Sequence, residues 1–231
     1  MPHSPRAVIF DLDDTLYPLR DFVDSGFLAV SRHLETRYGI DRGRALRMLR
    51  RASIGGQRGQ ELQALAARFD LPIAIVGDLV DLIRLHAPIL RLPPTSLATL
   101  LEMRSSWRIG IVTNGFPHLQ ARKIAALGLG PLVDTVIYAA EHGSGRGKPD
   151  REPFLAALDR LGVAPDRAVF VGDDERCDVY GAARAGLHAI QFAPHGRSLQ
   201  PCDAEAVVRS LDDVPPVATH LVSKEPARHV A

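Results

Sequence analysis

The hydrophobic residues near the start of the chain form a short unbroken run that ends abruptly in carboxylates. The apolar residues 8–10 are followed by Asp11-Leu12-Asp13-Asp14. An apolar run of this length, closed by polar residues, predicts a buried parallel strand that presents side chains at its carboxyl end. Open α/β sheets bind their ligands at that end of the strands, so we expect a site here.

The hydrophobic positions then change to a helical period. Between residues 23 and 38 they recur at steps of three and four, and similar stripes follow at residues 41–52, 60–69 and 74–86. Such stripes predict amphipathic helices. A group of helices with no strand between them, inserted after the first strand, predicts a separate helical subdomain, which we place at residues 18–92.

The second half of the chain alternates short apolar runs with helical stripes. This alternation predicts βαβ units and a parallel sheet, which makes the fold class α/β. We place the sheet core at residues 1–17 and 93–214, and a partly disordered or loosely attached C-terminal tail at residues 215–231. The predicted strands are residues 108–112, 133–139, 168–171 and 189–192, and the predicted helices are residues 97–104, 118–127, 153–161, 178–185 and 204–211.

Asp11 and Asp13 are the first candidates for chemistry. They stand two residues apart, so in a strand conformation their side chains point to the same side. Two carboxylates this close repel one another unless a cation lies between them, and a hard divalent ion, above all Mg²⁺, meets that need. The alternative is that these residues cap a helix or shape a turn, and the pair alone does not decide between the two interpretations.

Three further motifs follow at places where a predicted strand or loop ends. Thr113 and Asn114 follow the apolar run 109–112, and their hydroxyl and amides suit a phosphate oxygen at the start of a helix. Lys148 closes a glycine-rich loop, and its ammonium has the charge to neutralise a carboxylate and a phosphoryl group. The last motif, Gly172-Asp173-Asp174 with Asp178, again ends an apolar run in acids.

The order of these motifs resembles that of the haloacid dehalogenase-like (HAD) hydrolase superfamily. The resemblance implies a Rossmann-like doubly wound parallel sheet, an aspartyl-phosphate intermediate and Mg²⁺ dependence. Within the superfamily the chain is similar to the phosphatase branch with a small all-helical cap domain inserted between the first and second motifs. The residues that carry the resemblance are Asp11-Leu12-Asp13-Asp14-Thr15, Thr113-Asn114-Gly115, Lys148-Pro149, and Gly172-Asp173-Asp174 with Asp178.

The resemblance also implies catalytic roles. Asp11 is the expected nucleophile. Asp13 is the expected general acid and base, a residue that dehalogenases lack and phosphatases need for an alkoxide leaving group. Lys148 is expected to neutralise Asp11 and the transferring phosphoryl group, and Thr113 and Asn114 are expected to bind the phosphate with it.

The same resemblance implies a metal site. Mg²⁺ is expected to bind the nucleophile's carboxylate, the backbone carbonyl of Asp13 and the side chain of Asp173, a sparse set that suits an ion which keeps several waters. Asp174 is either a ligand or the N-cap of the next helix. Asp178 is expected to act through water or by orienting Lys148.

Composition limits the partners and the location. Lys and Arg number 28 against 27 Asp and Glu, which gives no reason to expect nucleic acid or an anionic membrane as partner. Cys177 and Cys202 form neither a metal-binding spacing nor a disulfide framework. No apolar run reaches membrane-spanning length and no signal peptide precedes the first strand. We therefore expect a cytoplasmic monomer or homodimer that acts on a small phosphorylated metabolite.

The leading functional hypothesis is a Mg²⁺-dependent phosphomonoesterase. A phosphomutase of sugar phosphates is one alternative, although such mutases tend to carry Gly at the position of Asp14. A sensor or binding module on the same fold is another, although every residue that the chemistry needs is present. The basic face of the second predicted helix either grips a second anionic group of the substrate or is only a solvated face; its residues are Arg44, Arg47, Arg50 and Arg51.

Overall fold

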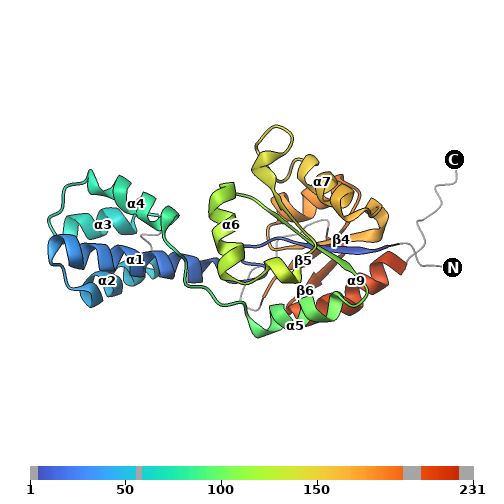
Figure 1. Ribbon diagram of the computed structural model, residues 1–231, viewed down its shortest axis with the longest axis horizontal. Helices are drawn as coiled ribbons and strands as arrows, with labels where there is room; N and C mark the ends of the chain where they lie inside the picture. Colours follow the sequence, from blue (N-terminus) through green and yellow to red (C-terminus); the bar gives the residue numbers. More distant parts are fainter. Residues whose placement is uncertain (1–4, 56–58, 195–203, 224–231) are drawn as a thin grey trace. The chain divides into compact units, whose positions relative to one another are not determined.

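The structure is a computed structural model that describes residues 5–55, 59–194 and 204–223. Its chain divides into two compact units, one of Met1–Pro18 with Arg91–Ala231 and one of Leu19–Leu90. The first unit contains a sheet with flanking helices, and the described residues of the second form helices and no strand (Figure 1). None of the helices in the described ranges combines the length and hydrophobicity that a membrane span requires.

The described part of the first unit contains a six-stranded parallel sheet with the strand order β3-β2-β1-β4-β5-β6. β1 lies inside the sheet between β2 and β4, and all of its residues are fully buried. The order of the strands reverses between β1 and β4, the place where doubly wound sheets bind ligands. The strands are β1 (Ala7–Phe10), β2 (Arg108–Thr113), β3 (Thr135–Tyr138), β4 (Ala168–Gly172), β5 (His188–Phe192) and β6 (Ala206–Val208).

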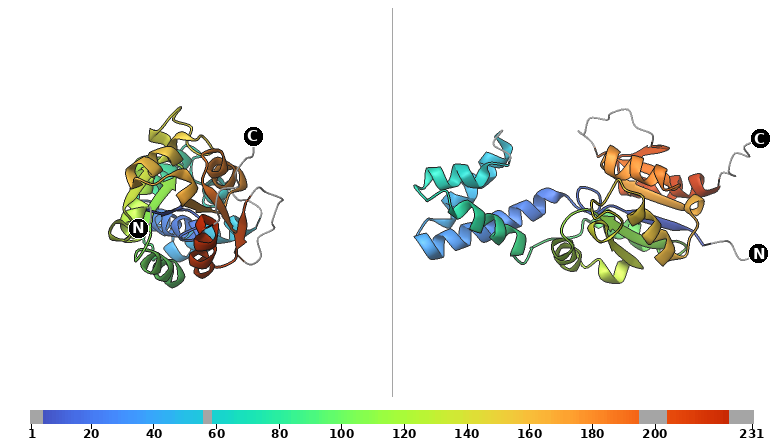
Figure 2. Two further views of the ribbon diagram at one scale, coloured as in Figure 1. Left: turned by 90° about the vertical axis from the view of Figure 1, so that its right-hand side faces the viewer. Right: turned by 90° about the horizontal axis from the view of Figure 1, so that it is seen from above.

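Helices cover both faces of this sheet (Figure 1, Figure 2). α7 and α8 bury their apolar sides on one face, where Phe154 of α7 meets Phe170 of β4 with ring centroids 5.0 Å apart. α5 and α9 pack together on the other face. The helices are α5 (Pro94–Met103), α6 (Pro117–Ala126), α7 (Glu152–Leu161), α8 (Gly181–Arg184) and α9 (Val214–Ser223), and the π-helix η4 spans Glu175–Tyr180.

The predicted α/β fold with a doubly wound parallel sheet is confirmed, but two local predictions are wrong. The helix predicted at residues 204–211 is replaced by β6, which pairs with β5 through Ile190 and Ala206. Its residues favour a helix locally, but pairing with the preceding strand satisfies the backbone in an extended form. The helix predicted at residues 178–185 is present, as the π-helix η4 followed directly by the short helix α8.

The second correction concerns the tail. Residues 215–223 are not loose, because they belong to α9, which buries Val214, Ala218 and Leu221 against the rest of the unit. Two prolines follow Val214 in the first turn of α9, where a missing amide proton costs no helical hydrogen bond. Residues 224–231 of the predicted tail lie outside the described residues.

The second unit is a group of helices around its own apolar core. Phe27, Val30 and Leu34 of α1 form the stripe that packs against the other helices. A hollow of about 590 Å³ lies beside α2. Arg44, Arg47, Arg51 and Arg68 line it, whereas Arg50 pairs with Asp24 at 3.1 Å. The helices are α1 (Leu19–Tyr38), α2 (Arg42–Ile54), α3 (Glu61–Arg68) and α4 (Ile75–Leu85).

Candidate active site

The first motif occupies the turn that leaves β1. The Asp11 amide donates to the Val171 carbonyl of β4 at 2.9 Å, which extends the sheet and holds Asp11 at its carboxyl edge. Asp14 then adopts a left-handed backbone with φ of 58°, and its amide donates to the Tyr17 carbonyl at 2.9 Å. Asp tolerates this conformation better than most residues, so Asp14 shapes the turn.

A buried lysine neutralises carboxylates at this edge. The Lys148 ammonium donates to Asp11 Oδ1 at 2.5 Å and to Asp178 Oδ1 at 2.7 Å. A third bond, to the Val112 carbonyl at 3.0 Å, uses its remaining proton. Burial alone would lower the pKa of Lys148, but the two carboxylates outweigh this effect and raise the pKa above its usual range. Lys148 is therefore a cation at neutral pH.

The loop that carries Lys148 is held by Asn114 at the end of β2. Asn114 Oδ1 accepts from the Lys148 amide at 2.8 Å, and Asn114 Nδ2 donates to the Lys148 carbonyl at 3.1 Å. A Cβ on Gly147 would stand 2.5 Å from Asn114 Oδ1, and its φ of 77° also favours glycine. The Asn114 side chain therefore holds the backbone of the lysine loop, and its predicted role in binding phosphate stays a prediction.

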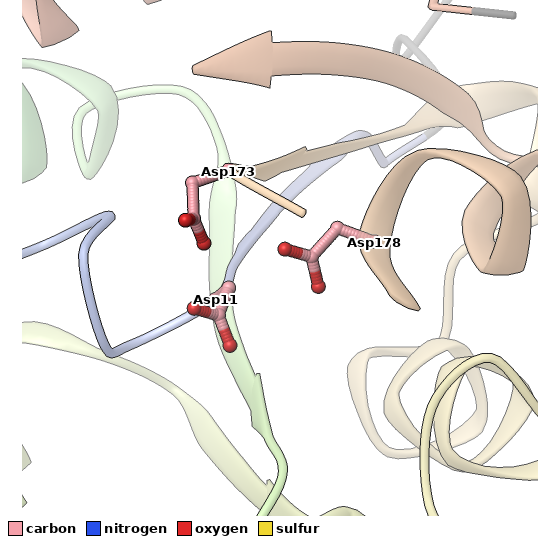
Figure 3. A group of neighbouring side chains, drawn as sticks. All are labelled: Asp11, Asp173 and Asp178. Carbon is pink, nitrogen blue, oxygen red and sulfur yellow. The ribbon is translucent and has the colours of Figure 1, made fainter. Parts of the chain in front are cut away.

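Three carboxylates converge beside Lys148 and form a candidate metal centre. Asp11 follows β1, Asp173 follows β4 and Asp178 lies on η4, and one oxygen from each lies within 4.8 Å of the others (Figure 3). Without a metal, burial raises the pKa of Asp11 to about 8 against the opposing charge of Lys148, and Asp178 adds to the rise. Three carboxylates beside one ammonium offer only oxygen donors and an excess of negative charge, which suits Mg²⁺.

Asp174 and Gly172 set the position of Asp178. Asp174 Oδ1 accepts from the Cys177 amide at 2.6 Å, so Asp174 caps η4, and its carboxylate is not part of the group of three. The Asp174 amide donates to Asp178 Oδ2 at 3.0 Å. A Cβ on Gly172 would stand 2.4 Å from Asp178 Cγ, so a side chain at that position would displace the carboxylate.

Asp13 is held by three residues that the sequence interpretation missed. The Lys123 ammonium lies 2.8 Å from both Asp13 oxygens, Gln120 Nε2 donates to Oδ2 at 2.9 Å, and the Tyr17 hydroxyl donates to Oδ1 at 2.6 Å. Gln120 also donates to the Thr113 hydroxyl at 2.6 Å. Burial and the neighbouring Asp13 raise the pKa of Tyr17 above its usual range, so it remains a donor.

A signal for two of these residues is present in the sequence. Gln120 and Lys123 stand three residues apart in the helix that follows Thr113, so they share one helical face. Both are buried, with 1% and 3% of their surface exposed, which is unusual for Gln and Lys. Helical periodicity alone does not reveal which face of α6 turns toward the site.

All the predicted site residues line one cavity of about 190 Å³ at the carboxyl edge of the sheet, together with Cys177. Thr113, the last residue of β2, adds a hydroxyl to this lining of carboxylates and a lysine. A larger hollow of about 310 Å³ in the same unit has a mostly apolar lining. The small polar cavity is therefore the candidate active site.

The chain belongs to the haloacid dehalogenase-like hydrolase family, whose model matches residues 5–186. It is 28% identical to glyceraldehyde 3-phosphate phosphatase of Methanocaldococcus jannaschii over 195 residues, covering 81% of this chain and 84% of the relative. It is 31% identical to ribulose-1,5-bisphosphate 5-phosphatase of Halopiger xanaduensis over 227 residues, covering 89% and 93%. The solved structure of a HAD phosphatase from Thermococcus onnurineus matches with a TM-score of 0.60 and 26% identity, covering 92% and 97%. The predicted family and the predicted class of enzyme, a phosphatase, are confirmed.

Proposed function

We propose that this protein hydrolyses a small phosphorylated metabolite with Mg²⁺ and through an aspartyl-phosphate on Asp11. The observation that carries the proposal is the 2.5 Å contact between the Asp11 carboxylate and the buried Lys148 ammonium, within a group of three carboxylates. A carboxylate held by a lysine and a divalent cation is ionised at neutral pH, which is the state that attacks phosphorus.

In the first step an Asp11 oxygen attacks phosphorus. The bond from this oxygen to phosphorus forms, and the bond from phosphorus to the ester oxygen breaks. Asp13 gives its proton to the departing oxygen, and Lys148 stays protonated and offsets charge on the phosphoryl group. The carboxylates of Asp11 and Asp173 and the backbone carbonyl of Asp13 would hold Mg²⁺, which would further neutralise the phosphoryl oxygens, while Asp178 orients Lys148.

In the second step water attacks the phosphorus of the aspartyl-phosphate. Asp13, now a carboxylate, takes a proton from this water as the bond between phosphorus and the Asp11 oxygen breaks. Inorganic phosphate leaves, Asp11 is a carboxylate again, and Asp13 has regained its proton, so the cycle closes. One residue serves as acid and then as base because the two steps need the proton in opposite directions.

The proposed substrate class is a phosphorylated sugar of short chain. Its support is chemical and comparative: the cavity is small and polar, which suits a phosphoryl group, and two relatives are named as phosphatases of glyceraldehyde 3-phosphate and ribulose-1,5-bisphosphate. The Thr113 hydroxyl and the Asn114 backbone amide are the proposed donors to the phosphoryl oxygens, and the N-terminal end of α6 adds its positive dipole.

The test is release of inorganic phosphate from p-nitrophenyl phosphate and from both named sugar phosphates, with Mg²⁺ and after chelation. We expect activity only with the metal, and we expect Asp11→Asn to lower kcat by about 10⁴-fold or more because the covalent step is lost. The matched control is Asp159→Asn, an exposed carboxylate on α7, which should keep full activity. Unchanged turnover in chelator or in Asp11→Asn would refute the proposal.

A further inference from the structure

A second buried lysine lies at this edge of the sheet, and it contacts Asp13 rather than Asp11. Lys123 comes from α6, its side chain is 4% exposed, and its ammonium lies 2.8 Å from both oxygens of Asp13. Lys148 contacts Asp11 at 2.5 Å. Two carboxylates that stand two residues apart therefore each have their own lysine.

Stability alone is a poor explanation for Lys123. Removing an ammonium from water costs free energy that the attraction to one carboxylate regains only in part, so a buried ion pair often contributes little to folding. The Asp13 side chain is 24% exposed, which weakens the attraction further through solvent screening. Lys123 instead orients the Asp13 carboxylate, because contact with both oxygens restricts its rotation.

The other contacts of Asp13 restrict it in the same way. The Tyr17 hydroxyl binds one oxygen at 2.6 Å, and Gln120 Nε2 binds the other at 2.9 Å. Gln120 also donates to the Thr113 hydroxyl at 2.6 Å, so one amide group joins Asp13 to a proposed phosphate-binding residue. A group that transfers a proton must be held near the atom that receives it, and a small displacement lowers the rate steeply.

We propose that Lys123 is the positioning residue for Asp13, and that Gln120 fixes the distance between Asp13 and Thr113. The inference rests on the proposed function, since it assigns residues that act through the general acid and base. Loss of Lys123 should therefore affect some phosphate esters more than others. Attack on an ester whose leaving group departs without a proton does not need Asp13, whereas departure of an alkoxide does.

The experiment measures kcat/KM for four phosphate esters with leaving groups of increasing basicity. They are 2,4-dinitrophenyl phosphate, p-nitrophenyl phosphate, phenyl phosphate and glyceraldehyde 3-phosphate. The full-length variants are Lys123→Met, which keeps the chain length without the charge, and Lys123→Arg, which keeps the charge. The matched control is Arg122→Met, an exposed residue next to Lys123 on α6.

We expect Lys123→Met to lower kcat/KM for 2,4-dinitrophenyl phosphate by less than about threefold, and for glyceraldehyde 3-phosphate by about 10²-fold or more. Lys123→Arg should recover part of the loss on the alkyl ester, and Arg122→Met should match the wild-type protein on all four esters. Gln120→Met, which leaves the ammonium in place, should show the same dependence on the leaving group in weaker form.

Two results would overturn the assignment in different ways. An equal loss of kcat/KM for all four esters in Lys123→Met would mean that Lys123 only supports the fold, while the phosphatase proposal would stand. A wild-type protein that hydrolyses none of the four esters with Mg²⁺ would overturn the proposed function and this assignment with it. If Lys123→Met does not fold, Gln120→Met decides the question by the same series.

Discussion

Replacing Lys148 with Met tests the charge balance of the site directly. The substitution removes an ammonium that lies 2.5 Å from Asp11 and 2.7 Å from Asp178, and both carboxylates stay buried, with 9% and 2% of their side-chain surface exposed. Breaking a buried ion pair by removing one partner costs about 3–5 kcal/mol in the free energy of unfolding. We expect a loss of this size in the protein stripped of metal.

The pH dependence of this loss follows from Asp11. In the metal-free protein, burial raises the pKa of Asp11 to about 8 even though Lys148 opposes the rise, so removal of Lys148 must raise it further. A carboxyl group whose pKa is higher in the folded than in the unfolded protein makes its full contribution to stability at a pH below the unfolded-state pKa. This contribution is lost as the pH rises toward the folded-state pKa. Wild type and variant therefore lose stability in parallel up to about pH 8.

Above that pH the two proteins separate. In folded wild type Asp11 has ionised beside Lys148, so its stability no longer falls with pH. In the folded variant Asp11 still holds its proton, so the free energy of unfolding keeps falling by about 1.4 kcal/mol per pH unit. Urea unfolding in a chelator at pH 6 and pH 9 measures the difference, with Arg151→Met, an exposed cation near the start of α7, as control. A difference between wild type and Lys148→Met that is smaller at pH 9 than at pH 6 would refute the reasoning.

Two further predictions concern neighbours of the carboxylates. Gly172→Ala should destabilise the fold by about 1–3 kcal/mol and abolish turnover, because the new Cβ would stand 2.4 Å from Asp178 Cγ. The control is Gly130→Ala, where a Cβ meets open space. Retained activity in Gly172→Ala would contradict the prediction. Burial, together with the charges of Asp174 and Asp178, raises the pKa of Cys177 to about 11. In a Cys202→Ser background, the rate of Cys177 alkylation by iodoacetamide should therefore rise about tenfold per pH unit from pH 7 to pH 10. A rate that levels off by pH 8 would show that the thiol is not held neutral.

Residues 8–10 and the apolar runs after residue 107 were sufficient to predict the fold class. A buried parallel strand is marked by continuous apolar residues, and its carboxyl end is marked by the first polar residues that follow. Asp11, Thr113 and Asp173 all follow such runs, so their convergence could be predicted before the order of the strands was known.

The edge of the sheet and the end of the chain were decided by tertiary contacts. β6 exists because Ala206 and its neighbours pair with β5, and α9 is ordered because Val214, Ala218 and Leu221 pack against the rest of the first unit. Both depend on partners outside the segment itself. Local propensity and periodicity carry no information about such partners, so they predicted a helix and a loose tail.

Side-chain pairing at the site also required the tertiary structure. The spacing of Gln120 and Lys123 shows that they share a face of α6, but only the packing of α6 turns that face toward Asp13. The motif predicts that Asn114 binds phosphate, but it does not predict that the Asn114 side chain also holds the backbone of the lysine loop, where Gly147 leaves room for it. The sequence by itself determined which residues reach the carboxyl edge of the sheet, because strand direction is a local property. Which of them touch was decided by the tertiary structure, because contact depends on distances of a few ångströms between elements far apart in the chain.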